Sequence, residues 1–161
     1  MRSMAGFEKK MLTQGELEHF RKKNGGKRIV FTNGCFDILH RGHVELFVRA
    51  KSLGDLLVVG LNSDDSVARL KGSQRPFVGE EDRAYILSAL AMVDYVTIFD
   101  EDTPLKTMMK LKPDVLVKGA EYDHEDIVGA KFIEEHGGRV ERMPMVKGFS
   151  TTSLIEKIRR G

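Results

Sequence analysis

The chain has 161 residues, 41% of them hydrophobic and 31% charged, which is typical of a globular domain large enough to bury a core. Its formal net charge of +2 at pH 7, without a Lys/Arg tract carrying interleaved aromatic residues, gives no support for nucleic-acid binding. The single cysteine excludes an intrachain disulfide and a Cys-based zinc site, and neither a bilayer-spanning apolar run nor a signal-peptide pattern occurs, so we expect a cytoplasmic protein without membrane contacts.

The N-terminal segment carries the weakest pattern. Residues 1–12 are predicted to form a loosely held arm. Thr13-Gln14-Gly15-Glu16 fits a capping box at the start of a short helix, and Asn24-Gly25-Gly26 is a stop signal for that helix. We therefore divide the chain into an N-terminal arm with a short helix, residues 1–25, and a main domain, residues 26–161.

Short apolar runs of β-rich composition alternate with helical patterns through the main domain. The runs predict five strands, at residues 28–32, 55–62, 95–99, 115–119 and 139–143. Helical spacing and capping residues predict helices that begin near residues 41, 63, 80, 102, 126 and 150. In the helix at 80–91, the side chains expected to face inward are Tyr85, Ile86, Ala89 and Leu90.

This alternation predicts an α/β fold: a single Rossmann-like, doubly wound domain with a five-stranded parallel sheet flanked by helices. Unbroken apolar runs such as Leu56-Leu57-Val58-Val59 suit a parallel sheet that is covered on both faces. In such folds, ligands bind beyond the carboxyl ends of the strands. The residues that follow each strand are therefore the first candidates for a site.

Two histidines stand where the first strand gives way to a helix. His40 and His43 are three residues apart, with Gly42 between them, so both imidazoles can lie on one face of the first helical turn. That turn leaves backbone N–H groups unpaired and attracts anions, and a bound phosphate would favour the charged imidazole. Taken by spacing alone, the pair could equally be incidental surface residues of an amphipathic helix.

Polar residues follow the other strands too. Asn62, Ser63 and Asp64 come after the second strand, and Lys118, Gly119, Glu121 and Tyr122 after the fourth. The stretch Gly148-Phe149-Ser150-Thr151-Thr152 opens a second helix rich in hydroxyl groups. Two anion-binding helix starts and a lysine can hold a triphosphate.

Rival motifs are missing. The sequence has no Gly-x-Gly-x-x-Gly after a strand, no Walker A loop, no Gly-x-Ser-x-Gly elbow and no Cys-x-x-Cys pair. His124, within Asp123-His124-Glu125-Asp126, reads as part of a solvated loop before a helix rather than as a metal ligand. Cys35 reads as a packed loop residue, because no activating base is identifiable.

The run from Gly34 to His43, GCFDILHRGH, resembles the His-x-Gly-His signature of the cytidylyltransferase-like nucleotidyltransferases. Later blocks sharpen the resemblance: LNSDDSV at 61–67, RLKG at 69–72 with Arg75-Pro76, EDTP at 101–104, LVKGAEY at 116–122 and GFSTT at 148–152. Together they are similar to the adenylyltransferase half of bifunctional bacterial heptose enzymes, or its stand-alone form, from about Gly26 to Arg159.

The resemblance implies transfer of AMP from ATP to heptose 1-phosphate, with release of pyrophosphate and with Mg²⁺ on the triphosphate. It implies three catalytic residues, His40, His43 and Lys71. The nucleotide-binding residues that it implies are Thr32, Asn33, Gly34, Phe36, Gly42, Lys118, Gly119, Glu121, Gly148, Ser150, Thr151 and Thr152. Those implied for the acceptor are Asp37, Asn62, Asp64 and Arg83.

Several of these roles stay open from sequence. Asp37 could orient its loop or help to hold the metal, Lys118 and Glu121 could face nucleotide or acceptor, and Arg83 could be an exposed helix arginine. The metal ligands are unknown. The resemblance also suggests a homo-oligomer.

Alternative functions remain as well. One is a glycerol-3-phosphate-type cytidylyltransferase, against which Met145 argues, because those enzymes carry an arginine at the corresponding place. Another is an archaeal-type FAD synthetase, and a third is a non-catalytic nucleotide-binding module. The kinase half of the bifunctional enzymes has no counterpart in this sequence, so the acceptor would be phosphorylated by another protein.

Overall fold

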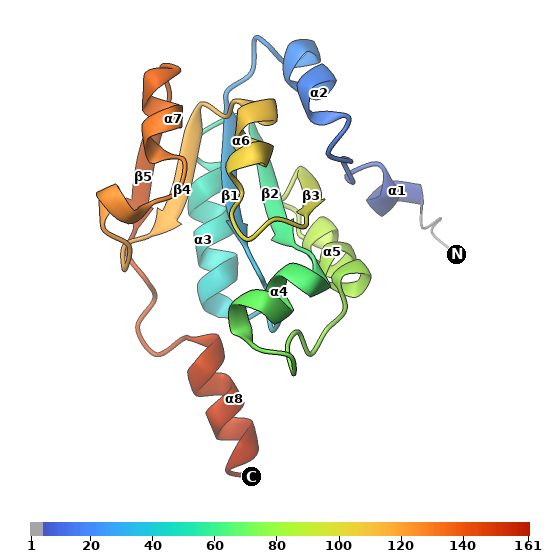
Figure 1. Ribbon diagram of the computed structural model, residues 1–161, viewed down its shortest axis with the longest axis vertical. Coiled ribbons are helices and arrows are strands. Elements are labelled where there is room, and N and C mark those ends of the chain that lie inside the picture. Colours follow the sequence, from blue (N-terminus) through green and yellow to red (C-terminus); the bar gives the residue numbers. More distant parts are fainter. Residues whose placement is uncertain (1–4) are drawn as a thin grey trace.

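A computed structural model describes residues 5–161, and its core is one five-stranded sheet. The spatial order is β3-β2-β1-β4-β5, and all four neighbouring pairs are parallel, which confirms the predicted doubly wound α/β fold (Figure 1). The strands are β1 (Ile29–Gly34), β2 (Leu56–Asn62), β3 (Tyr95–Phe99), β4 (Val115–Gly119) and β5 (Arg139–Met143).

The helices connect these strands in the predicted alternation. They are α1 (Ala5–Glu8), α2 (Leu17–Lys23), α3 (Arg41–Lys51), α4 (Asp64–Lys71), α5 (Glu80–Ala89), α6 (Leu105–Leu111), α7 (Ala130–Glu135) and α8 (Thr151–Arg159), with a 3₁₀ turn at His124–Asp126. No helix of the described residues is both long and apolar enough to cross a membrane.

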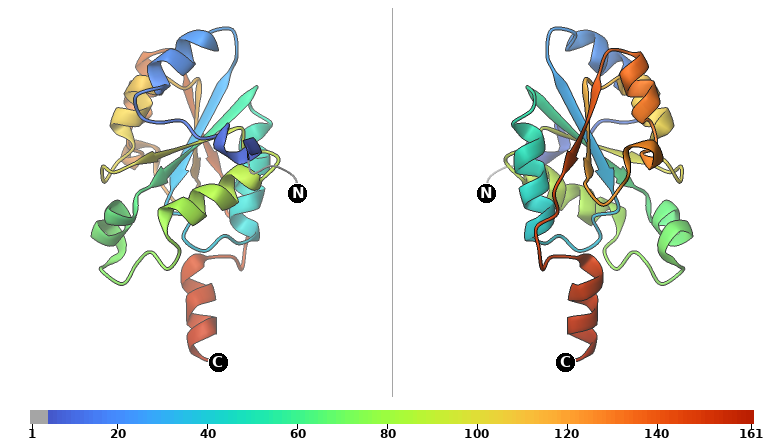
Figure 2. Two further views of the ribbon diagram at one scale, coloured as in Figure 1. Left: turned by 90° about the vertical axis from the view of Figure 1, so that its right-hand side faces the viewer. Right: turned by 90° about the vertical axis from the view of Figure 1, so that its left-hand side faces the viewer.

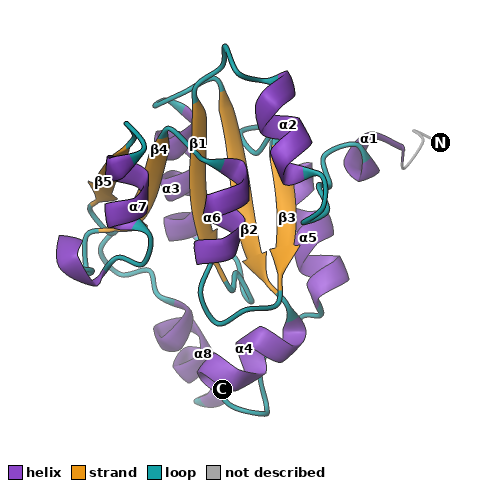
Figure 3. Cartoon of the chain, turned by 45° about the horizontal axis from the view of Figure 1, so that its top comes forward, coloured by secondary structure: helices purple, strands orange, loops and turns teal. Residues whose placement is uncertain are grey.

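Helices cover both faces of the sheet, as the edge-on views of Figure 2 show. On one face, α3 and α5 contribute Phe47, Ala50, Ala84 and Leu87 to a buried apolar cluster. On the other, α2, α6 and α7 pack a second cluster against the strands (Figure 3), including Leu17, Phe20, Met108, Leu111 and Ile133. Because both faces are covered, the strands can carry the unbroken apolar runs seen in the sequence.

The N-terminal segment is more ordered than predicted. The expectation of a loose arm at residues 1–12 is wrong for residues 5–12, and residues 1–4 lie outside the described part of the chain. Met11 makes a parallel bridge to Val96, and the Lys10 ammonium donates to the carbonyls of Leu90 and Val93. These contacts hold the segment against β3, where it covers the edge of the sheet.

The predicted capping box is only half formed. The Glu16 carboxylate accepts from the backbone N–H and the hydroxyl of Thr13, both at 2.8 Å. Because the Thr13 hydroxyl donates to Glu16, it does not cap the helix, which begins at Leu17. The predicted helix at 126–136 is likewise shorter, since a 3₁₀ turn precedes α7.

The inner face of α5 also differs from the prediction. Tyr85 and Ile86 are exposed, whereas Ala84, Leu87 and Ser88 are buried. Arg83 is buried and makes hydrogen bonds that the apolar pattern alone does not reveal. These bonds fix which face of α5 is turned toward the protein interior.

The sheet splits at its switch point. The β1–β2 ladder runs to Gly34↔Leu61, but the β1–β4 ladder ends at Phe31↔Leu116. Beyond it the Thr32 hydroxyl donates to the Val117 carbonyl at 3.0 Å, in place of a backbone ladder bond. The carboxyl ends of β1 and β4 therefore open a crevice, which is where doubly wound folds bind ligands.

Candidate active site

A cleft of about 600 Å³ opens at this split edge of the sheet. Its walls come from the segments after β1, β4 and β5, the first turns of α3 and α8, and the end of α4. All three predicted catalytic residues line it, as does Asp37. The predicted nucleotide-binding residues that line it are Thr32, Asn33, Gly34, Phe36, Gly42, Lys118, Gly119, Glu121, Ser150, Thr151 and Thr152.

The two histidines lie at the start of α3 with their rings stacked, 3.8 Å between centroids and 24° between planes. The Nδ1 atom of His40 accepts from the Gly42 N–H at 3.1 Å, and the Nδ1 atom of His43 accepts from the His40 N–H at 3.3 Å. An Nδ1 atom that accepts leaves the proton of a neutral imidazole on Nε2. Each ring therefore offers one Nε2–H donor to a guest in the cleft.

Both imidazoles are neutral at physiological pH in this environment. Burial lowers the pKa of His40. For His43, burial, and then the repulsion that a protonated His40 would exert, lower the pKa to about 4. A bound phosphate would raise both pKa values, so the charged imidazole that the sequence analysis associates with a phosphate would form only with an anion in the cleft.

Close packing explains the glycine and the aromatic residues around this pair. A Cβ atom on Gly42 would lie 2.9 Å from Cε1 of His40 and 3.3 Å from Cβ of Phe149. Phe36 has a positive φ of 45°, and its ring packs edge-on against His43 and Phe47. The Phe36 side chain is thus a largely buried support for His43.

The first turn of α8 completes the anion-binding surface. Ser150 caps the helix by accepting from the Ser153 N–H at 3.0 Å. Phe149 lies nearly parallel to the His40 ring, 6.3 Å between centroids, and so brings this turn close to the start of α3. Two helix N-termini consequently line one cleft. Gly148, predicted to bind nucleotide, is not in the lining; its φ of 84° makes the turn that precedes the helix.

Across the cleft, Lys118 follows β4. Its ammonium lies 5.7 Å from the centre of the Tyr122 ring, and burial lowers its pKa to about 8. A lysine with that pKa keeps its charge at pH 7, and the partly desolvated ammonium interacts strongly with an anion. A Cβ atom on Gly119 would overlap the Glu121 carboxylate, so Gly119 makes room for that side chain.

Asp37 joins its loop to the loop after α4, which favours the first of the two roles that the sequence left open. Its side chain is 1% exposed and accepts from the Arg75 guanidinium at 2.7 Å and from the N–H groups of Phe77 and Val78. These donors outweigh burial and keep the pKa of Asp37 below its usual value. With its oxygens engaged in this way, Asp37 is a poor candidate for a metal ligand.

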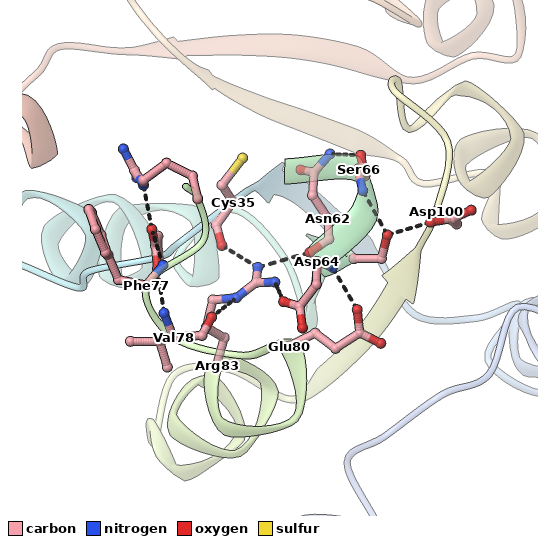
Figure 4. A network of polar contacts seen from close by, with 12 residues as sticks. Cys35, Asn62, Asp64, Ser66, Phe77, Val78, Glu80, Arg83 and Asp100 are labelled. Atoms are coloured by element: carbon pink, nitrogen blue, oxygen red, sulfur yellow. Dashed lines mark hydrogen bonds and ion pairs between the residues drawn. The ribbon is translucent and has the colours of Figure 1, made fainter. Parts of the chain in front are cut away.

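Three residues predicted to bind the acceptor lie outside the cleft lining. Arg83, 1% exposed, donates to the carbonyls of Val78, Cys35 and Asn62 and to the Asp64 carboxylate (Figure 4). The Asn62 amide donates to the Ser66 hydroxyl. The structure thus does not bring these three residues together with the cleft. Their polar groups are paired inside the protein, where they hold α4, α5 and the loop after β1 together.

Cys35 lies in the lining, half-buried. Burial raises the pKa of its thiol, so the group is protonated at pH 7 and a poor nucleophile. This agrees with its interpretation as a packed loop residue.

A preformed protein cage for a metal is absent from the described residues, where no three His, Cys, Asp or Glu side chains converge. Mg²⁺ fits the cleft in another way. It commonly keeps several waters and binds through substrate phosphates with one or two carboxylates. The cleft offers carboxylates at Glu45, Asp102, Glu121 and Asp126.

Comparison with known proteins gives a consistent result. A model of the family described as cytidylyltransferase-like matches residues 31–157. Over 140 residues the chain is 60% identical to bifunctional protein HldE of Geotalea uraniireducens, covering 87% of this chain and 29% of that protein. Over 155 residues it is 55% identical to bifunctional protein HldE of Campylobacter concisus, covering 96% of this chain and 32% of that protein. The chain thus spans less than a third of these relatives' length.

Two solved structures are similar as well. A lipopolysaccharide core biosynthesis protein from Thermoplasma volcanium superposes with a TM-score of 0.62 at 31% identity, covering 77% of this chain and all of that chain. A pantoate–β-alanine ligase from Francisella tularensis superposes with a TM-score of 0.62 at 16% identity, covering 94% of this chain and 78% of that one, which indicates a shared fold only.

Proposed function

The chain belongs to the cytidylyltransferase-like family and is a nucleotidyltransferase, and on that premise we propose that it transfers AMP from ATP to heptose 1-phosphate, giving ADP-heptose and pyrophosphate. The carrying observation is the pair of stacked imidazoles, each with its Nδ1 atom accepting a backbone hydrogen bond, that line a cleft together with two helix N-termini. Likeness of the motif blocks to heptose adenylyltransferases and to a lipopolysaccharide core biosynthesis protein supports the choice of sugar.

The chemistry requires positioning rather than a protein nucleophile. An oxygen of the acceptor phosphate is already anionic, so it can attack the α-phosphorus directly while pyrophosphate leaves. His40 and His43 would donate to phosphate oxygens on which charge develops, and the first-turn amides of α8 would do the same. Because both donors are fixed by backbone hydrogen bonds before substrate arrives, little reorganisation is needed during the reaction.

Charged side chains complete the proposed site. Lys71 and Lys118 would neutralise phosphates from opposite walls of the cleft. Bound with the triphosphate, Mg²⁺ would supply charge neutralisation of the leaving pyrophosphate. The exposed side chains after β4 and β5, Tyr122 and Met145, give the far wall an apolar surface suited to a base.

A pyrophosphate-release screen tests the proposal. It crosses ATP, CTP, GTP and UTP with heptose 1-phosphate, hexose 1-phosphates, glycerol 3-phosphate and FMN. We expect release above background only with ATP and heptose 1-phosphate. Turnover with CTP and glycerol 3-phosphate, or with ATP and FMN, would assign the cytidylyltransferase or FAD synthetase alternative, and no release in any combination would favour a binding module.

A further inference from the structure

The side chain of Asn33 carries a buried oxygen without a partner. Asn33 lies near the end of β1 and lines the cleft. Among the residues that the structure describes, its Oδ1 atom is the one buried side-chain nitrogen or oxygen that has no hydrogen-bond partner. Buried acceptors are nearly always paired, because an unpaired one costs free energy. A single exception in a ligand cleft points to a donor that the ligand supplies.

The Asn33 side chain lies on the face of the sheet that α2, α6 and α7 cover. Side chains alternate along a strand, and Asn33 comes two residues after Phe31. Phe31 belongs to the same buried cluster as Met108 and Leu111 of α6. A Cβ atom on Gly60 would meet both the Phe31 ring and the Cβ atom of Asn33, which places those two side chains on one face. Asn33 is therefore directed toward the α6 side of the sheet.

The histidines reach the cleft from the opposite face. Helix α3 packs Phe47 into the buried cluster of that face, and Phe36 of the same cluster supports His43. The segment that leads into α8 lies beside the His40 ring. Both helix N-termini, with the phosphates that they would bind, therefore belong to the α3 side of β1, whereas Asn33 faces the α6 side. The cleft thus has an α3 half and an α6 half.

The α6 half is rich in groups that accept hydrogen bonds. Besides Asn33, its lining comes from the segments that lead into α6 and α7: Asp102, Thr103, Pro104, Asp126, Ile127 and Val128. Carboxylate, hydroxyl and amide oxygens accept hydrogen bonds from hydroxyl groups. Val128, 39% exposed, adds apolar surface for C–H groups. Such a lining matches a carbon chain that carries several hydroxyl groups, which is the chemistry of a sugar.

Lys118 marks the boundary between the two halves. It comes two residues after Leu116, which is paired with Phe31 at the end of the β1–β4 ladder. Lys118 and Asn33 therefore occupy corresponding positions on the two strands that part at the cleft. In a direct displacement, the acceptor oxygen approaches the α-phosphorus opposite to the leaving pyrophosphate. A triphosphate held on the α3 side would thus meet its acceptor from the α6 side, with Lys118 near the phosphates of both.

We propose that the α6 half of the cleft holds the sugar of the acceptor, and that Asn33 selects it by accepting a hydrogen bond from a sugar hydroxyl. A terminal amide turns about its Cβ–Cγ bond at little cost, so Oδ1 can leave its unpaired position and meet that hydroxyl in the cleft. A site that pairs a polar group with a substrate hydroxyl disfavours acceptors that lack it. The inference rests on the proposed function in that the acceptor is a sugar phosphate. It gives Asn33 to the acceptor, whereas the family resemblance gives it to the nucleotide.

Steady-state kinetics of Asn33→Ala test this role, with pyrophosphate release as the readout and with ATP and heptose 1-phosphate varied in turn. KM for heptose 1-phosphate should rise by about five- to tenfold, as expected for one lost hydrogen bond, while KM for ATP stays within about twofold of wild type. The midpoint of urea unfolding should be unchanged or higher, because alanine removes an unpaired buried oxygen. Asn24→Ala is the matched control, since the Asn24 amide donates to the Phe20 carbonyl outside the cleft lining, and both KM values should be unchanged.

The possible results separate this inference from the proposed function. An active wild-type chain whose Asn33→Ala variant keeps its KM for heptose 1-phosphate within about twofold would overturn the inference alone. A rise in KM for ATP as large as that for the acceptor would overturn it too, because Asn33 would then serve the nucleotide or only support the loop. Turnover with a hexose 1-phosphate instead of heptose 1-phosphate would correct the proposed sugar, and the same difference between the two KM values would then be expected for that acceptor. A wild-type chain without turnover on any sugar phosphate would overturn both.

Discussion

Replacing His43 by alanine should abolish most turnover while leaving the protein folded. The substitution removes one Nε2–H donor that is aligned before substrate binds, because Nδ1 of the same ring accepts from the His40 N–H. Loss of one such donor typically costs about 3–4 kcal/mol of transition-state stabilisation. We therefore expect kcat for pyrophosphate release to fall by about a hundred- to a thousand-fold.

The cost in stability can be worked out separately. His43 stacks on His40 and packs edge-on against Phe36, and it makes one backbone hydrogen bond. Aromatic pairs and single hydrogen bonds each contribute about 1 kcal/mol, so the loss is about 2–3 kcal/mol. A domain with about 5–15 kcal/mol of stability tolerates that loss.

The assay is coupled pyrophosphate detection at saturating substrates, with thermal unfolding measured in parallel. His43→Gln keeps an N–H donor and should recover part of the lost rate. His124→Ala is the matched control, since His124 is exposed and pairs with Glu134 at 2.7 Å, outside the cleft lining. A His43→Ala enzyme that stays folded and keeps kcat within about threefold of wild type would remove His43 from the mechanism.

Four further outcomes follow from the same geometry. The folded protein lowers the pKa of His43 from 6.5 to about 4, so between these pH values the unfolded chain binds more protons than the folded protein does. The free energy of unfolding should therefore fall by about 3 kcal/mol as pH drops from 6.5 to 4, and a His43→Gln chain with the same dependence of urea unfolding on pH would refute this. Lys118, with a pKa of about 8, should lose its charge above that pH, so KM for the nucleotide should rise by up to about tenfold per pH unit, and Lys118→Arg should flatten the rise. Gly42→Ala should displace the His40 ring, given the 2.9 Å approach, and lower kcat by about tenfold or more with little change in nucleotide KM; unchanged kcat would show that the ring position is not limiting. Arg83→Met should destabilise the fold by about 3–5 kcal/mol in urea unfolding, since it leaves the carbonyls of Cys35 and Asn62 without their donor inside the protein and removes the ion pair to the partly exposed Asp64 carboxylate. A loss below about 1 kcal/mol would contradict that account.

The fold was predictable because its signals are local. Apolar runs with β-rich composition, broken by glycine and asparagine, predicted all five strands to within a few residues. Their alternation with helices left the doubly wound order as the expected topology, and the sheet has that order. The helix start at His40 and the cap at Ser150 were predictable for the same reason, since capping chemistry involves residues only two or three apart.

Whether the polar side chains after β2 point into the cleft or into the protein interior was less predictable. The carboxyl edge of the sheet, where the cleft lies, is also where Asn62, Asp64 and Arg83 are found. Their positions in the sequence do not reveal which way their side chains point. Only the packing of α5 against β2 and β3 makes Arg83 an internal donor with four acceptors, three of them backbone carbonyls. The face of α5 was mispredicted for a related reason, because a buried arginine is invisible to a search for apolar periodicity.

By itself, the sequence determined the order and type of the elements, the parallel sheet, and the presence of two histidines where β1 leads into α3. Those features depend on neighbours within a few residues along the chain. The tertiary structure alone decided the lowered pKa values of the imidazoles and the commitment of Asp37 to Arg75 and to the N–H groups of Phe77 and Val78. Burial, charge and open hydrogen-bond donors are set by contacts between residues tens of positions apart, which no local pattern encodes.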